Sequence, residues 1–321
     1  MGSWWQFWVL VNEALPESLD GERADRVVAM LGGVSRSVAS KAIEDESVLV
    51  DGRPVLKPSQ RLNAGQQVVI PESIGEQDLA PRPDPSVEVN VVYVDEDIIV
   101  VDKASGTVVH PGAGNREATI VNGLLADFPE LANVGQVERP GVVHRLDKGT
   151  TGVFVLARSQ RAYESLTEQL RDRSVERRYL TVGWGQPKTG RGVVEAPLGR
   201  AVRDPTRMVV RPDGKTARTS YEVVARWDEP NVALFACTLD TGRTHQIRVH
   251  LEAIHHPVVG DVRYGGGRDS LGIDRPALHA STLGFVHPGS GETMQFQSPL
   301  PDDFAELLTR FGPPVEGEVE S

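Results

Sequence analysis

The segment GVVHRLDKGTTGVFVLAR, residues 141–158, sets one aspartate, Asp147, between two valine-rich runs. The apolar residues at 142–143 and 153–156 predict two buried strands, joined by a loop that carries Asp147. The glycines of this loop leave room for the backbone to approach a ligand closely. Loops held between strands commonly carry the chemistry of a protein, so Asp147 is the first candidate site residue.

Strand patterns recur on both sides of this segment, and helical patterns interrupt them. VNVVYVDEDIIVVDK (89–103) and ETMQFQSP (292–299) predict strands. SQRAYESLTEQLRDR (159–173) and HQIRVHLEAI (245–254) place apolar residues on one helical face. Strands outnumber helices and do not alternate with them regularly. This order favours an α+β fold with a mixed, mostly antiparallel sheet over a doubly wound fold.

A separate small domain is predicted over residues 17–74. Ser35 is expected to cap a short helix, and Asp51-Gly52 is a two-residue turn that closes a hairpin. QVVIP (67–71) supplies a further strand. The other predicted segments are an N-terminal extension (1–16), an acidic proline-rich linker (75–88), the larger domain (89–310) and an acidic tail (311–321).

The composition indicates a folded protein of a reducing compartment. The chain has 321 residues, of which 39% are hydrophobic and 25% charged, so it can bury a sizeable core. Its single cysteine, Cys237, excludes a disulfide framework and a cysteine-built zinc site, and suits a reducing compartment such as the cytoplasm. The apolar start, MGSWWQFWVL, is too short to span a bilayer and lacks the features of a signal peptide, so no membrane association is expected.

The net charge of −11 argues at first against a nucleic-acid partner. However, the acidic residues are concentrated, with nine acids and one arginine over 71–102 and six acids and one arginine over 301–321. The segment 198–218 carries six cations against two acids. Such a run is typical of either a solvated face or a phosphate-binding surface, and both interpretations stay open.

Asp147 has several possible roles when its neighbours alone are considered. A metal ligand would need further carboxylates or histidines, and only His144 is near, so no metal site is expected. DKGTTG suggests a phosphate-accepting aspartate, but the order after the lysine differs and no acidic cluster for magnesium is found. A nucleophile or base that acts without a cofactor remains, as does an aspartate that caps a turn.

Motifs elsewhere in the chain bear on this choice. VERRYLTV (175–182) places Tyr179 in a strand, and LDTGRTHQIRVHLEAIHHPVVGDVRYGG (239–266) places Arg243 before a helix that Thr244 is expected to cap. With HRLD..TTG, these motifs resemble the RluA-type pseudouridine synthases. Similarity to the RluD-type members, which act on large-subunit ribosomal RNA, extends through VVDKASGTVVHPGAGN, RPGVVHRLDKGTTG, EAPLGR, GKTARTSYEV, GDVRYGG and ALHA. Ala104 replaces a usual proline, and Gly149 a usual aspartate.

The small domain carries a second resemblance. RADR…SRS…VLVDG…KPSQRL..GQQVVI resembles the αL-type RNA-binding domain of a ribosomal small-subunit protein and of many RNA-modifying enzymes, although EDES stands where a glycine is usual. The alternative is a surface helix with ordinary charges. The resemblance implies phosphate contacts by Arg23, Arg26, Arg36 and Lys41.

The first resemblance implies the pseudouridine synthase fold and a reaction that needs no cofactor. Asp147 would attack the ribose or the base, or remove a ribose proton, and the sequence does not choose among these routes. Arg243 is implied as the cation that keeps Asp147 ionised. Tyr179 would stack on the uracil, and Arg145 would fill the gap left by the flipped-out uridine. His144, His245 and Arg248 are expected to pack around the site.

The sequence therefore predicts a cytoplasmic, monomeric RNA pseudouridine synthase. Its expected partner is large-subunit ribosomal RNA or a pre-ribosomal particle. The alternative is a non-catalytic RNA-binding factor of ribosome assembly on the same fold. The joint presence of Asp147, Tyr179 and Arg243 favours the enzyme.

Overall fold

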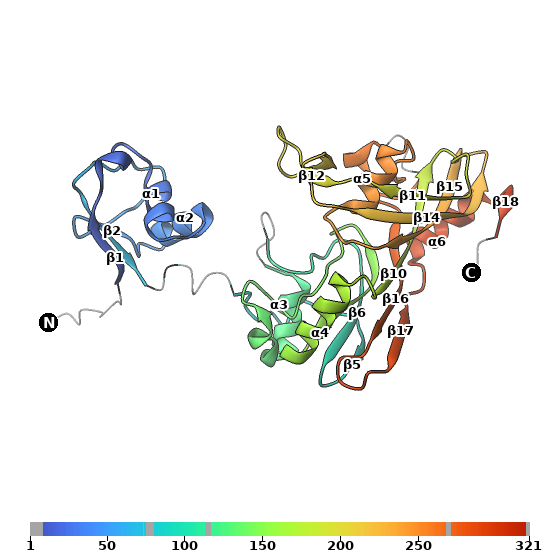
Figure 1. The fold of residues 1–321 in the computed structure, drawn as a ribbon, viewed down its shortest axis with the longest axis horizontal. Helices are drawn as coiled ribbons and strands as arrows, with labels where there is room; N and C mark the ends of the chain where they lie inside the picture. Colours follow the sequence, from blue (N-terminus) through green and yellow to red (C-terminus); the bar gives the residue numbers. More distant parts are fainter. Residues whose placement is uncertain (1–8, 73, 75–79, 113–116, 268–270, 319–321) are drawn as a thin grey trace. The chain divides into compact units, whose positions relative to one another are not determined.

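The chain divides into two compact units, Met1–Ala80 and Pro81–Ser321 (Figure 1). The structure is a computed structural model that describes residues 9–72, 74, 80–112, 117–267 and 271–318. No helix in these ranges is long and apolar enough to cross a bilayer.

The first unit is a small antiparallel sheet with two helices. The strand order is β1-β4-β2-β3, and the core includes Val27 and Val28 from α1, Ile43 from α2 and Ile70 from β4. Of the N-terminal extension expected over residues 1–16, residues 1–8 lie outside the described residues, whereas β1 pairs with β4 and belongs to the sheet. The elements are β1 (Val9–Ala14), η1 (Glu17–Leu19), α1 (Ala24–Leu31), α2 (Arg36–Glu44), β2 (Leu49–Val50), β3 (Arg53–Pro54) and β4 (Gln67–Pro71).

Two local predictions for this unit are confirmed. The hydroxyl of Ser35 accepts a hydrogen bond from the amide of Val38, which caps α2. Asp51 and Gly52 adopt positive φ angles of 51° and 75°, as a two-residue hairpin turn requires. The Asp51 carboxylate also accepts from the Gln67 amide at 2.9 Å, which ties the hairpin to β4.

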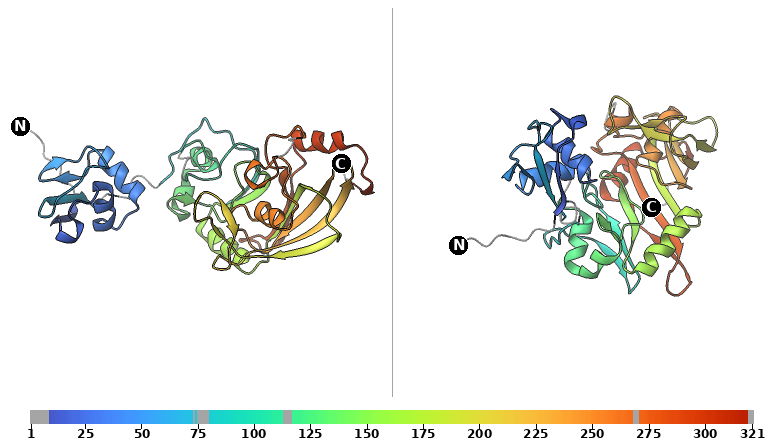
Figure 2. Two further views of the ribbon diagram at one scale, coloured as in Figure 1. Left: turned by 90° about the horizontal axis from the view of Figure 1, so that it is seen from above. Right: turned by 60° about the vertical axis from the view of Figure 1, so that its left-hand side comes forward.

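The second unit is built on a ten-stranded sheet (Figure 2). Eight of its strands follow the order β11-β14-β15-β10-β16-β9-β6-β5, and the other two, β17 and β18, pair with β16 and β14. The strand pairs are antiparallel except that of β9 with β16, so the predicted mixed, mostly antiparallel α+β fold is confirmed. The strands of this sheet are β5 (Val91–Val94), β6 (Ile98–Lys103), β9 (Thr151–Ala157), β10 (Glu176–Trp184), β11 (Arg191–Glu195), β14 (Arg218–Trp227), β15 (Val232–Leu239), β16 (Leu278–Val286), β17 (Thr293–Gln297) and β18 (Glu316–Gly317).

Helices and two short hairpins surround this sheet. Helix α4 packs on β9, and α5 packs on β13 and β14 (Figure 1). The remaining elements are α3 (Ile120–Asp127), η2 (Pro129–Asn133), β7 (Gly135–Gln136), β8 (Arg139–Pro140), α4 (Gln160–Arg171), β12 (Leu198–Arg200), β13 (Met208–Val210), α5 (Gln246–Ala253), η3 (Val262–Tyr264) and α6 (Asp302–Phe311).

Strand β9 is buried along its whole length and fixes the end of the loop that carries Asp147. At Gly152 the backbone has φ of 112°, and a Cβ atom would lie 2.2 Å from the carbonyl oxygen of Ala280 on β16. A side chain there would separate the two strands, which explains the glycine at the end of GVVHRLDKGTTG. The strand predicted before the loop is reduced to one bridge, between Val142 and Leu156.

Parts of the predicted linker (75–88) and tail (311–321) pack on the larger unit, while residues 75–79 and 319–321 lie outside the described residues. The amide of Asp84 donates to the carbonyl of Asn122, and Nδ2 of Asn122 donates to the carbonyl of Arg82, so these residues pack on α3. At the other end, Phe311 packs against Trp227 with ring centroids 5.4 Å apart, and β18 pairs with β14. The packed structure therefore continues as far as Gly317.

Candidate active site

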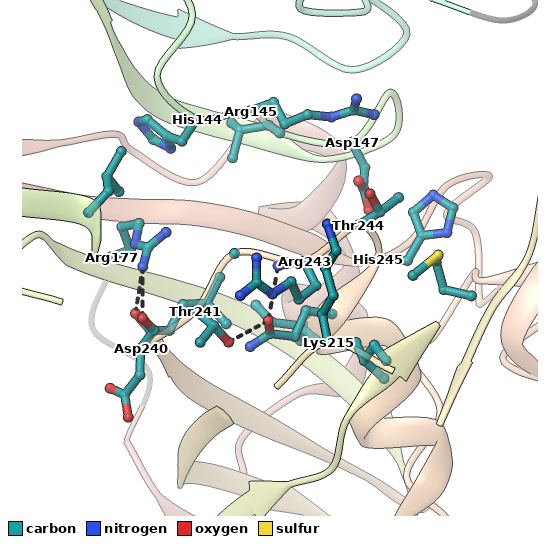
Figure 3. A pocket seen from close by; sticks show the side chains of 18 of the residues that line it. His144, Arg145, Asp147, Arg177, Lys215, Asp240, Thr241, Arg243, Thr244 and His245 are labelled. Atoms are coloured by element: carbon teal, nitrogen blue, oxygen red, sulfur yellow. Dashed lines mark hydrogen bonds between the residues drawn. The ribbon is translucent and has the colours of Figure 1, made fainter. Parts of the chain in front are cut away.

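A cavity of about 1060 Å³ opens in the second unit beside the loop that carries Asp147 (Figure 3). Asp147, Arg145, Tyr179 and Arg243 all line it, so the structure brings these four predicted residues together. In Figure 3 the carboxylate of Asp147 points into the space between its loop and the segment that carries Arg243 and His245. The cavity can thus present a carboxylate, a phenol and several guanidinium groups to one ligand.

The Asp147 loop is held from below by a buried lysine. Nζ of Lys103, at the end of β6, donates to the carbonyls of Ala104, Thr107 and Lys148 at 2.8, 2.8 and 3.1 Å. Burial lowers the pKa of Lys103 to about 8, although the charge of Asp147 opposes this effect. Within the loop, the amide of Thr150 donates to the carbonyl of Asp147. These contacts make a rigid support for the carboxylate.

Asp147 forms its ion pair with Arg248. Nη1 of Arg248 donates to Oδ2 of Asp147 at 3.2 Å, and the two side chains are only 10% and 16% exposed. Arg248 lies in the first turns of α5, and its guanidinium also binds Asp261 and stacks 4.9 Å above the ring of Tyr264. Burial works against the charge of Arg248, but the two carboxylates outweigh it and raise the pKa of this arginine.

The expected pairing of Arg243 with Asp147 is not formed within the described residues. Nε of Arg243 donates instead to the carbonyl of Thr216 at 3.1 Å. The expected cap at Thr244 is also wrong, because α5 begins at Gln246 after His245, which has a left-handed φ of 56°. Oε1 of Gln246 accepts from the amide of Arg243 at 3.0 Å. Arg248, within α5, contacts the carboxylate instead.

Tyr179 sits in the middle of β10, between β15 and β16, and is 6% exposed. Burial raises the pKa of its phenol to about 12, while the nearby Arg177 opposes this shift. The phenol therefore stays protonated over the usual range of enzyme assays. It is suited to packing and hydrogen-bond donation rather than to accepting a proton.

Two histidines beside the loop are neutral near pH 7. Burial lowers the pKa of His144 to about 3, and Nε2 of its ring accepts from the amide of Val155 at 3.2 Å. Burial also lowers the pKa of His245, although Asp147 opposes it, and Nδ1 of His245 lies 2.7 Å from the hydroxyl of Tyr264. Both rings support neighbouring groups.

The cavity also carries cations that have no carboxylate partner. Arg145, Lys215 and Arg243 line it, and in the described ranges none of the three forms an ion pair. Nη1 of Arg145 contacts Nε2 of His110 at 3.2 Å. Arg177 is buried and donates to the carbonyls of Leu239 and Asp240 (Figure 3). Such a surplus of positive charge suits a polyanionic ligand.

Comparison with known proteins identifies the family. The RNA pseudouridylate synthase family matches residues 97–253, and the S4 domain matches residues 22–68. The chain is 43% identical over 313 residues to the ribosomal large subunit pseudouridine synthase D of Xanthomonas campestris, covering 94% of this chain and 92% of that protein. The chain belongs to the RNA pseudouridine synthase family.

Other relatives agree with this assignment. An uncharacterized RNA pseudouridine synthase of Bacillus subtilis is 39% identical over 297 residues, which cover 91% of this chain and 95% of that protein. The solved structure of human RNA pseudouridylate synthase domain containing 1 superposes with a TM-score of 0.56 at 26% identity, over 75% of this chain and 94% of that chain. The predicted fold and enzyme class of this RNA pseudouridine synthase are therefore confirmed.

The S4 domain of the synthase holds the other four predicted RNA contacts. Asp25 is 4% exposed and accepts hydrogen bonds from Arg23 and Arg36, which lower its pKa to about 2. Arg26 pairs with Glu22 at 2.8 Å, and Lys41 with Asp45 at 2.6 Å. Each predicted phosphate contact of the S4 domain is therefore engaged by an acid of the same domain.

Sequence reasoning missed Lys103 and Asp261, and it expected Arg248 to pack around the site but not to pair with Asp147. Lys103, Arg248 and Asp261 are all buried, and their contacts join segments far apart in the chain. A charged residue within an apolar stretch is the signal that could have indicated them, because a buried charge needs a partner. Lys103 ends the apolar run of β6, and Arg248 lies among the buried residues of α5.

Proposed function

We propose that this synthase isomerises specific uridines of large-subunit ribosomal RNA to pseudouridine, with Asp147 as the group that starts the reaction. One observation carries the proposal: Asp147 lies on a rigid loop in a cationic cavity, with one contact to Arg248 at 3.2 Å. The named relatives support the choice of RNA, because the relative from Xanthomonas campestris is a ribosomal large subunit pseudouridine synthase.

In the proposed reaction the bond between C1′ of the ribose and N1 of uracil breaks. The base turns, C1′ bonds to C5, and C5 loses a proton that N1 gains, so every atom is retained. Asp147 starts this sequence as a nucleophile toward the ribose or the base, or as a base toward a ribose proton. Each route requires the ionised carboxylate, which the Arg248 guanidinium stabilises.

Tyr179 and the cavity cations have separate parts in this proposal. The ring of Tyr179 offers a flat face for the uracil, and its protonated hydroxyl can donate a hydrogen bond. Arg243 and Lys215 bind phosphates on either side of the extruded nucleotide. Arg145, which is exposed on the Asp147 loop, fills the gap left in the RNA. The counter-ion role expected of Arg243 passes to Arg248.

The S4 domain is proposed to anchor the RNA outside the cavity through Arg23, Arg26, Arg36 and Lys41. With this arrangement the synthase acts as a monomer in the cytoplasm during ribosome biogenesis, on ribosomal RNA or on a pre-ribosomal particle. The proposed division of the chain is an S4 domain within residues 9–74 and a synthase domain that begins near Pro81.

Mapping pseudouridines in ribosomal RNA tests the proposal. RNA from cells with the wild-type gene, without it, and with an Asp147→Asn allele should be compared at single-nucleotide resolution. We expect particular large-subunit sites to lose pseudouridine in the second and third strains. Identical maps in all three strains would contradict the proposal.

A further inference from the structure

Asp261 binds the face of Arg248 that is turned away from Asp147. Its side chain is 1% exposed and accepts from Nε of Arg248 at 2.6 Å and from Nη2 at 3.0 Å. It also accepts from the amide of Arg263 at 3.1 Å, which caps the short helix η3. Asp261 thus has a fixed place in the fold, and Arg248 is held by a bidentate pair.

This pair determines how Arg248 can meet Asp147. A guanidinium offers five N–H groups in a planar fork, and the edge formed by Nε and Nη2 is taken by Asp261. Only Nη1 reaches Asp147, at 3.2 Å, which is longer than either contact to Asp261. The ring of Tyr264 packs against the guanidinium face at 4.9 Å and opposes its rotation.

The single contact leaves Asp147 partly available. A bidentate pair would occupy both carboxylate oxygens and would stabilise their charge most strongly, which weakens a nucleophile or base. We propose that Asp261 is a positioning residue that prevents Arg248 from closing onto Asp147 as a bidentate pair, and so keeps one carboxylate oxygen open to the substrate. This inference rests on the proposed role of Asp147.

Other charged and titratable groups also face the two carboxylates. Those whose charges act on Asp147, or that lie beside it, are Lys103 from β6, Tyr179 from β10, His245 and Arg248 at the start of α5, and Arg145 and Lys148 on its own loop. Those that face Asp261 are Arg248, Arg263, Tyr264 and His245.

The test is the substitution Asp261→Asn in the full-length protein. Asparagine keeps the shape and the acceptor that caps η3, but it loses the charge and one of the two acceptors for Arg248. With ribosomal RNA as substrate, we expect kcat to fall by about tenfold or more and KM to change less than about twofold. The acid limb of the pH–rate profile should move to lower pH, because Arg248 then shares its charge with Asp147 alone.

The direction in which the acid limb moves shows whether Asp261→Asn changes the position of Arg248 or only disrupts the structure. Removing the cation by Arg248→Met should move the acid limb to higher pH, which is the opposite direction. The matched control is Asp97→Asn. Asp97 is 4% exposed and forms a bidentate pair with Arg161 of α4, and neither residue lines the cavity. We expect that control to keep the wild-type pH profile.

Several results would overturn the inference. A folded Asp261→Asn protein with wild-type kcat and pH profile would do so, as would an acid limb that moves to higher pH. If the asparagine variant fails to fold by circular dichroism, Asp261→Ser takes its place, because a serine hydroxyl can still cap η3. An inactive wild type, or an active Asp147→Asn, would instead reject the proposed function, and the role of Asp261 with it.

Discussion

The S4 domain and the synthase cavity hold their cations in different ways. In the S4 domain, Arg23 and Arg36 share Asp25, and Arg26 binds Glu22. In the cavity, Arg145, Lys215 and Arg243 form no ion pair with any described residue. Phosphate must displace an acid in the first case, whereas in the second it competes with no described carboxylate. We infer that the cavity supplies more binding energy per cation than the S4 surface does.

Substitution of Asp147 should have the largest effect, because it should stop the reaction while RNA still binds in the cavity. Asp147→Asn keeps the volume of the side chain but removes its charge, so we expect the rate to fall on the order of a thousandfold or more. RNA affinity should stay within about twofold, since the cations that bind phosphate are unchanged. Single-turnover assays and binding titrations with the same RNA measure both quantities. A turnover near the wild-type rate, in protein checked for deamidation, would exclude Asp147 as the reacting group.

Removal of the S4 domain has the next largest expected effect. A protein of residues 81–321 keeps the whole cavity, and it should retain its maximal rate while KM rises by about tenfold. A plot of the logarithm of RNA affinity against the logarithm of salt concentration should be less steep for this protein than for the full-length protein. The slope should be smaller by about 0.7 to 0.9 for each phosphate that the S4 domain binds. Affinities across a salt series for both proteins measure this difference. Equal slopes in two folded proteins would show that the S4 domain does not anchor RNA.

A smaller effect is expected when a cation of the S4 domain is released. Glu22→Gln removes the acid that binds Arg26, whose side chain is 53% exposed, so that Arg26 can turn to phosphate. We expect RNA affinity to rise by about two- to fivefold at low salt and less at high salt. Arg191→Ala is a control that removes a cation from another exposed pair, with Glu222, outside the cavity. A weaker affinity in Glu22→Gln would argue against this explanation.

The smallest expected effect concerns Tyr179, whose contribution to the rate should not change with pH. Because burial raises the pKa of Tyr179 to about 12, its hydroxyl is protonated on both sides of neutrality and cannot create an alkaline limb below about pH 10. The ratio of the rates of wild type and Tyr179→Phe should therefore be independent of pH between about 6 and about 10. A ratio that changes near pH 8 would show that the phenol titrates in the active complex.

Features that depend on neighbouring residues could be predicted from the sequence. Ser35 and Ser159 cap helices whose first turns follow them directly, and both caps are present. The motif around Asp147 could be recognised because all of its residues lie in one continuous segment of the chain. The core strand β9 is likewise a continuous apolar run. Each of these features rests on short-range chemistry.

Features that depend on distant residues were missed. The cap of α5 was expected at Thr244 but is His245, so the helix begins at Gln246, and it is Arg248 within this helix that reaches Asp147. Asp147 and Arg248 are 101 residues apart, and no local pattern joins them. Strand β1 was taken as an extension because its partner β4 follows only after both helices.

Two matched substitutions test whether Arg248 or Arg243 is the counter-ion of Asp147. Arg248→Met and Arg243→Met remove the same group from positions that both line the cavity. We predict that Arg248→Met lowers kcat by about a hundredfold and moves the acid limb of the pH–rate profile to higher pH, because Asp147 loses its cation. Arg243→Met should mainly raise KM and leave the acid limb in place. The reverse result, with the limb moving in Arg243→Met and not in Arg248→Met, would contradict this account.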